Sequence, residues 1–238
     1  MLSKEKGTPR LIMLSQLSSR DRRRIELYSD HCMRPNSGIL SLSLSLMAQA
    51  QNTPERELIR KLYKSILNGN MTEVRDQWST ITDLYGAVTP RGDNILHTAI
   101  CMKHEDIAKE ILKKCKEPER LLTKENALGD TVLHEAAATD MTYIARELLK
   151  SAPELLVKRN TRGETPLFRA AHYGKADTFR ALADKLDEEE KEPEKKMAHL
   201  KRHDGTTILH ITILAEFFGE YFLLTTIYVE SILFKQNA

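Results

Sequence analysis

The 238-residue sequence has only three cysteines and one tryptophan, and its start holds no apolar run long enough for a secretory leader. Cys32, Cys101 and Cys115 are odd in number and share no C-x-x-C spacing, so neither a disulfide framework nor a zinc site is expected. Reduced thiols and the missing leader favour a cytoplasmic protein. A net charge of +2 is too small to favour nucleic acid as a partner.

Motifs of catalysis are missing as well. The sequence contains no glycine-rich phosphate loop, no dinucleotide fingerprint and no G-x-S-x-G nucleophile turn. His134-Glu135 does not extend to H-E-x-x-H, because position 138 is Ala138. We therefore expect no enzyme activity, no catalytic residue, no cofactor and no metal site.

The N-terminal stretch is basic and shows no helical period. Up to residue 54 it carries eight Lys or Arg against four acids. The segment SGILSLSLSLMAQA alternates apolar residues with serine as a strand does, but it has no sheet to join. We predict that residues 1–52 form a disordered basic arm, and that a helix starts at Thr53-Pro54-Glu55.

The rest of the chain repeats itself. LLTKENALGDTVLHEAA from Leu121 and LLVKRNTRGETPLFRAA from Leu155 share nine of seventeen residues, and GDNILHTAI and GTTILHITI are shorter copies. The leucines at the fixed point of each phrase ("key leucines") are Leu96, Leu133, Leu167 and Leu209, at steps of 37, 34 and 42 residues. A period near 33 with a phrase close to T-P-L-H-x-A is the ankyrin signature.

Residue types around each phrase predict a finger followed by two helices. Glycine at the finger tip (Gly92, Gly129, Gly163 and Gly205) suits positive φ. The following threonine can cap the first helix, and Pro166 fits its first turn. His97, His134 and His210 share one position, where histidine supports the adjoining turn by hydrogen bonding. Apolar pairs eleven to sixteen residues after each key leucine predict the second helix.

The predicted fold is therefore all-α, an ankyrin-repeat solenoid of about five helix-turn-helix units with hairpin fingers. The repeats are expected over residues 53–218, with units at about 53–86, 87–123, 124–157, 158–199 and from 200 onward. Residues 219–238 are predicted to be an apolar tail outside the repeats. No unit can bury its apolar stripe alone, so the units must stack.

Two regions depart from the period. The surplus of the 42-residue step lies in KLDEEEKEPEKKMAHLK, which predicts a lengthened second helix ending near Pro193 and then a long finger. The stretch ITILAEFFGEYFLLTTIYVESILF is apolar, but Glu216, Glu220 and Glu230 interrupt it and argue against a membrane span. Residues from Leu209 to about Leu224 are expected to form the fifth helix pair, with no polar cap on its far side.

Several phrases together resemble plant ankyrin–transmembrane proteins: LYKSILNGNMTEV, RGDNILHTAICMKHEDIAKEIL, NALGDTVLHEAA, NTRGETPLFRAAHYGKADTF and HDGTTILHITILAEFF. Members of that family join an ankyrin array to a C-terminal PGG-type membrane region. The resemblance implies a scaffold in defence or salt-stress signalling, with the plasma membrane as a second location. It ends near Phe218, which suggests a product truncated before the membrane region.

Partners of ankyrin arrays meet the finger tips and the exposed positions of the first helices. The resemblance therefore implies a protein-binding module, and Arg162 and Tyr173 are the favoured anchors, because Arg and Tyr dominate interface hot spots. Counted from the key leucines, the predicted partner-binding residues are Arg91, Asp93, Met102, Leu128, Asp130, Thr139, Arg162, Glu164, His172 and Tyr173.

Two alternatives stay open. The uncapped fifth unit could stack on the array of a full-length relative and modulate its assembly. The apolar tail and the basic arm could instead hold the protein at a membrane, although this reading is weaker. The sequence does not name the protein partner.

Overall fold

A computed structural model describes residues 54–78, 85–215 and 220–235, and these residues form helices joined by short connections. The predicted basic arm lies outside the described residues. In chain order the helices are α4 (Pro54–Leu67), α5 (Met71–Trp78), α6 (Ile95–Cys101), α7 (Glu105–Lys114), α8 (Pro118–Leu122), α9 (Val132–Thr139), α10 (Thr142–Ser151), the 3-10 helix η1 (Pro153–Val157), α11 (Pro166–His172), α12 (Ala176–Glu189), α13 (Pro193–His199), α14 (Ile208–Leu214) and α15 (Glu220–Lys235).

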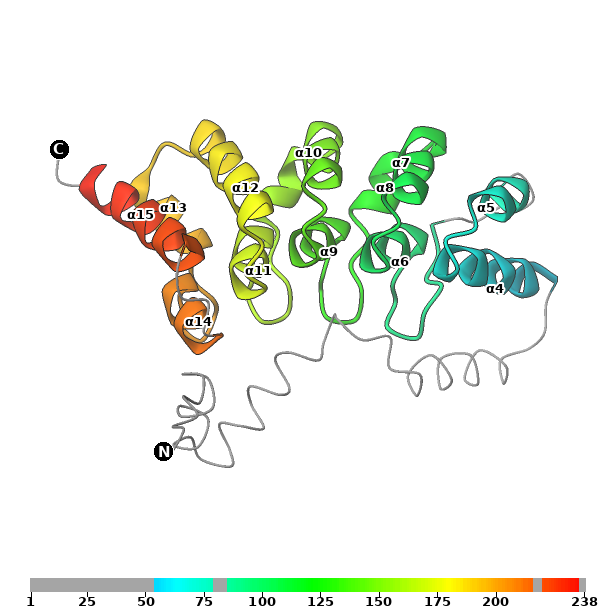
Figure 1. Cartoon of the computed structure of the whole chain (residues 1–238), viewed down its shortest axis with the longest axis horizontal. Coiled ribbons are helices and arrows are strands. Elements are labelled where there is room, and N and C mark those ends of the chain that lie inside the picture. The colour runs from blue at the N-terminus through cyan, green and yellow to red at the C-terminus, as the bar shows by residue number, and fades with distance from the viewer. Residues whose placement is uncertain (1–53, 79–84, 216–219, 236–238) are drawn as a thin grey trace, which may run out of the picture. The chain divides into compact units, whose positions relative to one another are not determined.

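The helices form two rows (Figure 1). The first helices α4, α6, α9, α11 and α14 stand side by side in one row, and the second helices α5, α7, α10 and α12 form the other. In the described residues the only β-type pairing is one isolated bridge between Lys201 and Thr207. The prediction of an all-α array of about five helix pairs is confirmed.

The core lies between the two rows and runs through all the units. The key leucines Leu96, Leu133 and Leu167 are almost completely buried, and so are Ile111 and Leu148 of the second helices. Alanine pairs on α9 and α11 have no exposed surface, so neighbouring first helices approach closely there. Each unit therefore buries its apolar stripe partly against the next one, as stacking repeats do.

Local sequence explains where the first helices begin. Thr165 caps α11 by accepting a hydrogen bond from the Phe168 amide (3.1 Å), and Pro166 occupies the first helical position. At α9 the amide of Thr131 donates to Nδ1 of His134 (3.1 Å). The predicted threonine side-chain cap is confirmed at α11 and at α14, where Thr207 accepts from the His210 amide, whereas Asn94 takes this role at α6.

The fourth unit differs from its prediction. Helix α12 has 14 residues where α7 and α10 have 10, so the second helix is lengthened as expected. The predicted long finger is wrong, because Pro193 starts a separate helix, α13. The side chain of Lys196 on α13 is buried and forms an ion pair with Asp187 of α12, which ties the two helices together.

The apolar tail is also helical. Helix α15 packs against α12, α13 and α14 and buries Val229 and Ile232. The ring of Tyr228 meets the ring of Phe179 edge-on, with centroids 5.7 Å apart. Residues 220–235 therefore supply the second helix of the fifth pair. Among the described residues, no helix combines the length and apolar character needed to cross a membrane.

Candidate protein-binding face

The fingers and the first helices together form one surface of the array, which we call the inner face. Of the ten predicted partner-binding residues, six are partly exposed on it: Arg91, Asp93, Met102, Leu128, Arg162 and Tyr173. Their part in binding stays a prediction. The other four, Asp130, Thr139, Glu164 and His172, are buried.

A ladder of hydrogen bonds connects neighbouring fingers. The side-chain amide of Asn126 donates to the Asp93 carboxylate in the preceding finger (2.8 Å), and that of Asn160 donates to Asp130 (2.8 Å). The side-chain oxygen of Asn160 also accepts from the amides of Arg162 and Glu164 (both 3.0 Å). Each asparagine therefore shapes its own finger and binds the previous one.

Glu164 lies at the centre of a buried ionic cluster. Its carboxylate is within 3.5 Å of Arg169 and of Arg202, and within 3.4 Å of Nδ1 of His172. Arg169 also reaches Asp130 at 3.4 Å. Burial acts to raise the pKa of Glu164, but His172, Arg169 and Asn160 beside it outweigh this and lower that pKa to about 2. Glu164 thus stays ionised and fixes the fourth finger.

The expectation that Asp130, Thr139, Glu164 and His172 are exposed is wrong. Their exposed fractions are 0%, 4%, 0% and 5%. The two acids are covered because the next finger supplies their hydrogen-bond partners, and the Thr139 hydroxyl donates to the Glu135 carbonyl on its own helix (2.7 Å). These residues stabilise the array and do not present themselves to a partner.

Asp93 and Arg91 are only partly available. Asp93 accepts from the Thr89 hydroxyl (2.8 Å) and from Asn126, so it belongs to the ladder. Arg91 forms a 2.6 Å ion pair with Glu135, a fully buried carboxylate on α9. The guanidinium of Arg91 therefore closes one end of a buried pair, and its exposed part contributes to the inner face.

Tyr173 ends α11 as a braced aromatic side chain. Its ring stacks on His172, with centroids 4.8 Å apart, and the Arg169 guanidinium lies 4.9 Å from its centroid. Arg162 lies at the tip of the fourth finger, and no carboxylate among the described residues pairs with it. A fixed aromatic side chain and a cation with spare hydrogen-bonding capacity are typical of interface anchors.

Histidines make a second connection between units. Nε2 of His97 donates to the Asp130 carbonyl (3.1 Å), and Nε2 of His134 donates to the Glu164 carbonyl (3.0 Å), because a carbonyl oxygen can only accept. Burial lowers the pKa of His134 to about 4. The predicted turn-supporting role is confirmed for these two histidines.

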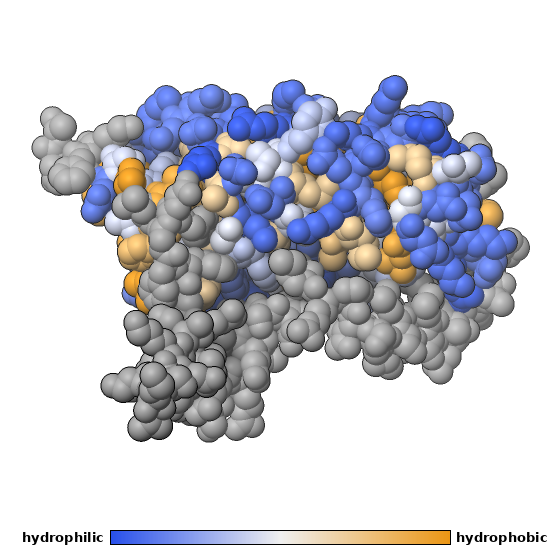
Figure 2. All heavy atoms as spheres, viewed as in Figure 1, coloured by the Kyte–Doolittle hydropathy of each residue, from blue (hydrophilic) through white to orange (hydrophobic). Residues whose placement is uncertain are grey.

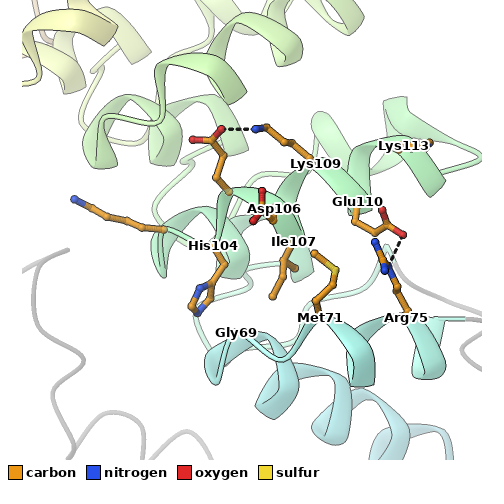
Figure 3. Close-up of a pocket in the computed structure, with 11 residues that line it drawn as sticks. Gly69, Met71, Arg75, His104, Asp106, Ile107, Lys109, Glu110 and Lys113 are labelled. Carbon is orange, nitrogen blue, oxygen red and sulfur yellow. Dashed lines mark hydrogen bonds and ion pairs between the residues drawn. The ribbon is translucent and has the colours of Figure 1, made fainter.

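One pocket of about 660 Å³ lies between α5 and α7, away from the fingers (Figure 3). Its cations and acids are partly paired, with Arg75 3.0 Å from Glu110 and Lys109 2.6 Å from Glu105. Small-molecule sites are mostly apolar, so this pocket is a poor candidate. In residues 54–78, 85–215 and 220–235 no cluster of His, Cys, Asp or Glu could hold a metal ion.

Four residues that connect the units were not predicted from the sequence: Asn126, Asn160, Arg169 and Glu135. Both asparagines stand three residues before a finger-tip glycine, so a repeated N-x-x-G phrase was the available signal. Arg169 and Glu135 share one position, two residues after a key leucine, where the other two units have the uncharged Thr98 and Ile211. A charge at an otherwise uncharged repeat position pointed to a special contact.

Comparison with known proteins agrees with this geometry. A family model of ankyrin repeats (three copies) matches residues 119–195. NF-kappa-B inhibitor alpha of Gallus gallus is 37% identical over 87 residues, which are 37% of this chain and 27% of that protein. The proteins of the same name from Rattus norvegicus and Homo sapiens are 37% and 36% identical over 89 residues. This chain spans 27% of the length of each of these relatives. The helix pairs, the fingers and these matches together show that the chain carries an ankyrin-repeat array.

Proposed function

We propose that the protein is a binding module or scaffold that holds another protein on its inner face. The observation that carries the proposal is the pair of Tyr173 and Arg162 in the fourth unit: Tyr173 is a braced aromatic ring, and Arg162 is a finger-tip cation with which no described carboxylate pairs. The relatives are named as inhibitors of NF-kappa-B, and this supports a binding module.

The chemistry of the two anchors suggests the partner segment. Arg162 can donate two parallel hydrogen bonds to a carboxylate, and the Tyr173 ring offers an apolar surface with a polar edge. A segment that places an acidic side chain next to an apolar one fits both. Met102 and Leu128 add apolar surface along the same face.

The test compares two double variants of the full chain. Arg162→Ala with Tyr173→Ala should weaken binding of a captured protein partner by at least about 2 kcal/mol, roughly thirtyfold. Tyr143→Ala with Arg146→Ala is the matched control, because both side chains are exposed on α10 in the other row. Calorimetry would measure the affinities and circular dichroism the fold. Equal affinity of the folded inner-face variant and wild type would contradict the proposal.

We further propose that this binding serves stress or defence signalling in plants, a narrower role that rests on the resemblance of the repeat phrases. Its test is genetic. Plants that lose the protein should change in salt tolerance or in response to infection, and the wild-type gene should restore them where the Arg162/Tyr173 double variant does not. If salt tolerance and the response to infection are unchanged, the proposed role in stress or defence signalling is wrong, but the proposal of a binding module is unaffected.

A further inference from the structure

Among the described residues, nothing covers one side of the fifth helix pair. Figure 2 shows apolar residues at the end where α14 and α15 lie, whereas the row of second helices is largely hydrophilic. Ile213 and Leu214 of α14 have exposed fractions of 50% and 59%. We call the side of the fifth unit that faces away from the fourth the end face, and define it by Asp204, Gly205, His210, Ile213 and Leu214.

Repeat register explains what this face lacks. Ile213 lies four residues after its key leucine, where Ile100, Ala137 and Ala171 have no exposed surface. The second helix of the fifth unit, α15, is already in place against α14. The missing cover is therefore that of a following first helix, since α9, α11 and α14 cover the earlier units.

His210 is oriented as the buried histidines are. The Thr207 amide donates to its Nδ1 at 3.2 Å, as the Thr131 amide does to His134 at 3.1 Å. In the earlier units the opposite nitrogen, Nε2, donates to a carbonyl of the next finger. No described residue accepts from Nε2 of His210, whose side chain is exposed. The Nε2–H group of His210 is therefore oriented to donate to a carbonyl outside this unit.

The fifth finger, like His210, has the geometry for contacts with a following unit. A Cβ added to Gly129 would lie 2.9 Å from the amide of Thr161 in the next finger, whereas one added to Gly205 would meet only Lys201 of its own finger, at 3.7 Å. The carbonyls of Arg91 and Leu128 accept from amides of the following finger, at 2.7 and 2.9 Å. Asp204 is the equivalent residue before Gly205, so its carbonyl faces the same open side.

We propose that the end face binds an ankyrin-type unit of another protein chain. The finger of that unit packs beside the fifth finger, as successive fingers do within this array. The incoming unit supplies a carbonyl to His210, an amide to the Asp204 carbonyl and a first helix that covers Ile213 and Leu214. Thr206 occupies the repeat position at which Asp93, Asp130 and Glu164 bind side chains of the next finger. Because Thr206 is not an acid, the partner does not need the asparagine that binds Asp93 and Asp130. A second copy fits poorly, because its first unit lacks the finger phrase.

A labelled peptide of residues 124–157 provides a probe. It is the unit that covers the same side of unit two within this chain, through the contact of Ala127 with Arg91. Single repeats do not fold alone, so the peptide should gain helix only on a repeat surface. We expect saturable binding to the full chain by fluorescence anisotropy, and no binding of a scrambled peptide. Absence of saturable binding would overturn the proposal.

Variants locate the site. Ile213→Glu with Leu214→Glu should weaken peptide binding at least tenfold, and Val157→Glu, an equally exposed apolar position on η1, should not. His210→Phe copies Phe168 at the same register and should weaken binding about fivefold by removing one donor. The Arg162/Tyr173 double variant should bind the peptide normally, which separates this proposal from the inner face. Equal binding by wild type and the Ile213/Leu214 variant would overturn it.

Sedimentation of the full chain alone tests a second copy as the occupant. A monomer supports the proposal. A dimer that the Ile213/Leu214 substitutions abolish would overturn it in favour of self-association through the end face.

Discussion

The third and fifth units share a local motif but not its surroundings. In both, threonine and histidine form the same hydrogen bond at the start of the first helix, at 3.1 and 3.2 Å. His134 has no exposed surface, because the fourth finger covers it, whereas His210 is exposed. Local sequence therefore builds the geometry of a unit, and the neighbouring unit decides its burial and its contribution to stability.

Ile100 and Ile213 occupy the same repeat position, and their truncation should give the largest difference in stability between a covered unit and the fifth unit. Ile100→Ala should lower the free energy of unfolding by about 2–5 kcal/mol, because Ile100 is fully buried and its removal leaves a cavity. Ile213→Ala should cost less than about 1 kcal/mol, since half of that side chain is already exposed. Urea unfolding followed by circular dichroism measures both. Equal losses would show that Ile213 is covered in solution.

Acid should destabilise the array through the buried His134. The pKa of His134 is about 4 in the folded protein and 6.5 ordinarily, so the unfolded state binds more protons between these values. Stability conferred by neutral His134 is present above pH 6.5 and is lost as the pH falls toward 4, by about 1.4 kcal/mol per pH unit at most. Burial lowers the pKa of His97 and of His172 as well, so these two histidines add to the loss of stability as the pH falls.

His134→Phe isolates this effect, because Phe168 occupies the same repeat position without an exposed atom. Between pH 6.5 and 5 the slope of unfolding free energy against pH should become shallower in His134→Phe than in wild type. Urea titrations at several pH values supply the slopes. Glu164, whose pKa is about 2, contributes equally to the slopes of the two proteins. A slope in His134→Phe identical to that of wild type would rule out His134 as the source.

The same contrast explains what sequence could predict. Helix pairs, finger-tip glycines and threonine caps follow from residues close together in the chain, and they were predicted correctly. Burial of Asp130 and Glu164 depends on Asn160 and Arg202, which lie about 30 and 38 residues further along the chain. An acid beside a finger-tip glycine looks the same whether the next finger reaches it or solvent does, so these residues were wrongly expected to be exposed.

Helices α13 and α15 were harder to predict because they match no phrase of the repeat. Pro193 was interpreted only as the end of α12, although proline is equally suited to starting a helix. The tail was interpreted from its composition, whereas its place against α12 depends on Tyr228 meeting Phe179, about fifty residues earlier. Periodicity is informative where a unit repeats and silent where it ends.

Glycine at the finger tip offers the smallest contrast. Gly129 and Gly205 have φ of +70° and +83°, so alanine at either position is strained by about 1 kcal/mol. Only at Gly129 would the new methyl group also press on the backbone of the next finger, where it would lie 2.9 Å from the Thr161 amide. Such crowding typically lowers the free energy of unfolding by about a further 1–3 kcal/mol. Gly129→Ala should therefore destabilise the array more than Gly205→Ala in urea unfolding. If the ankyrin-type peptide is bound, the difference should shrink, because the peptide places a finger against Gly205 as Thr161 lies against Gly129. A difference that the peptide leaves unchanged would mean that it binds without reproducing the finger contact.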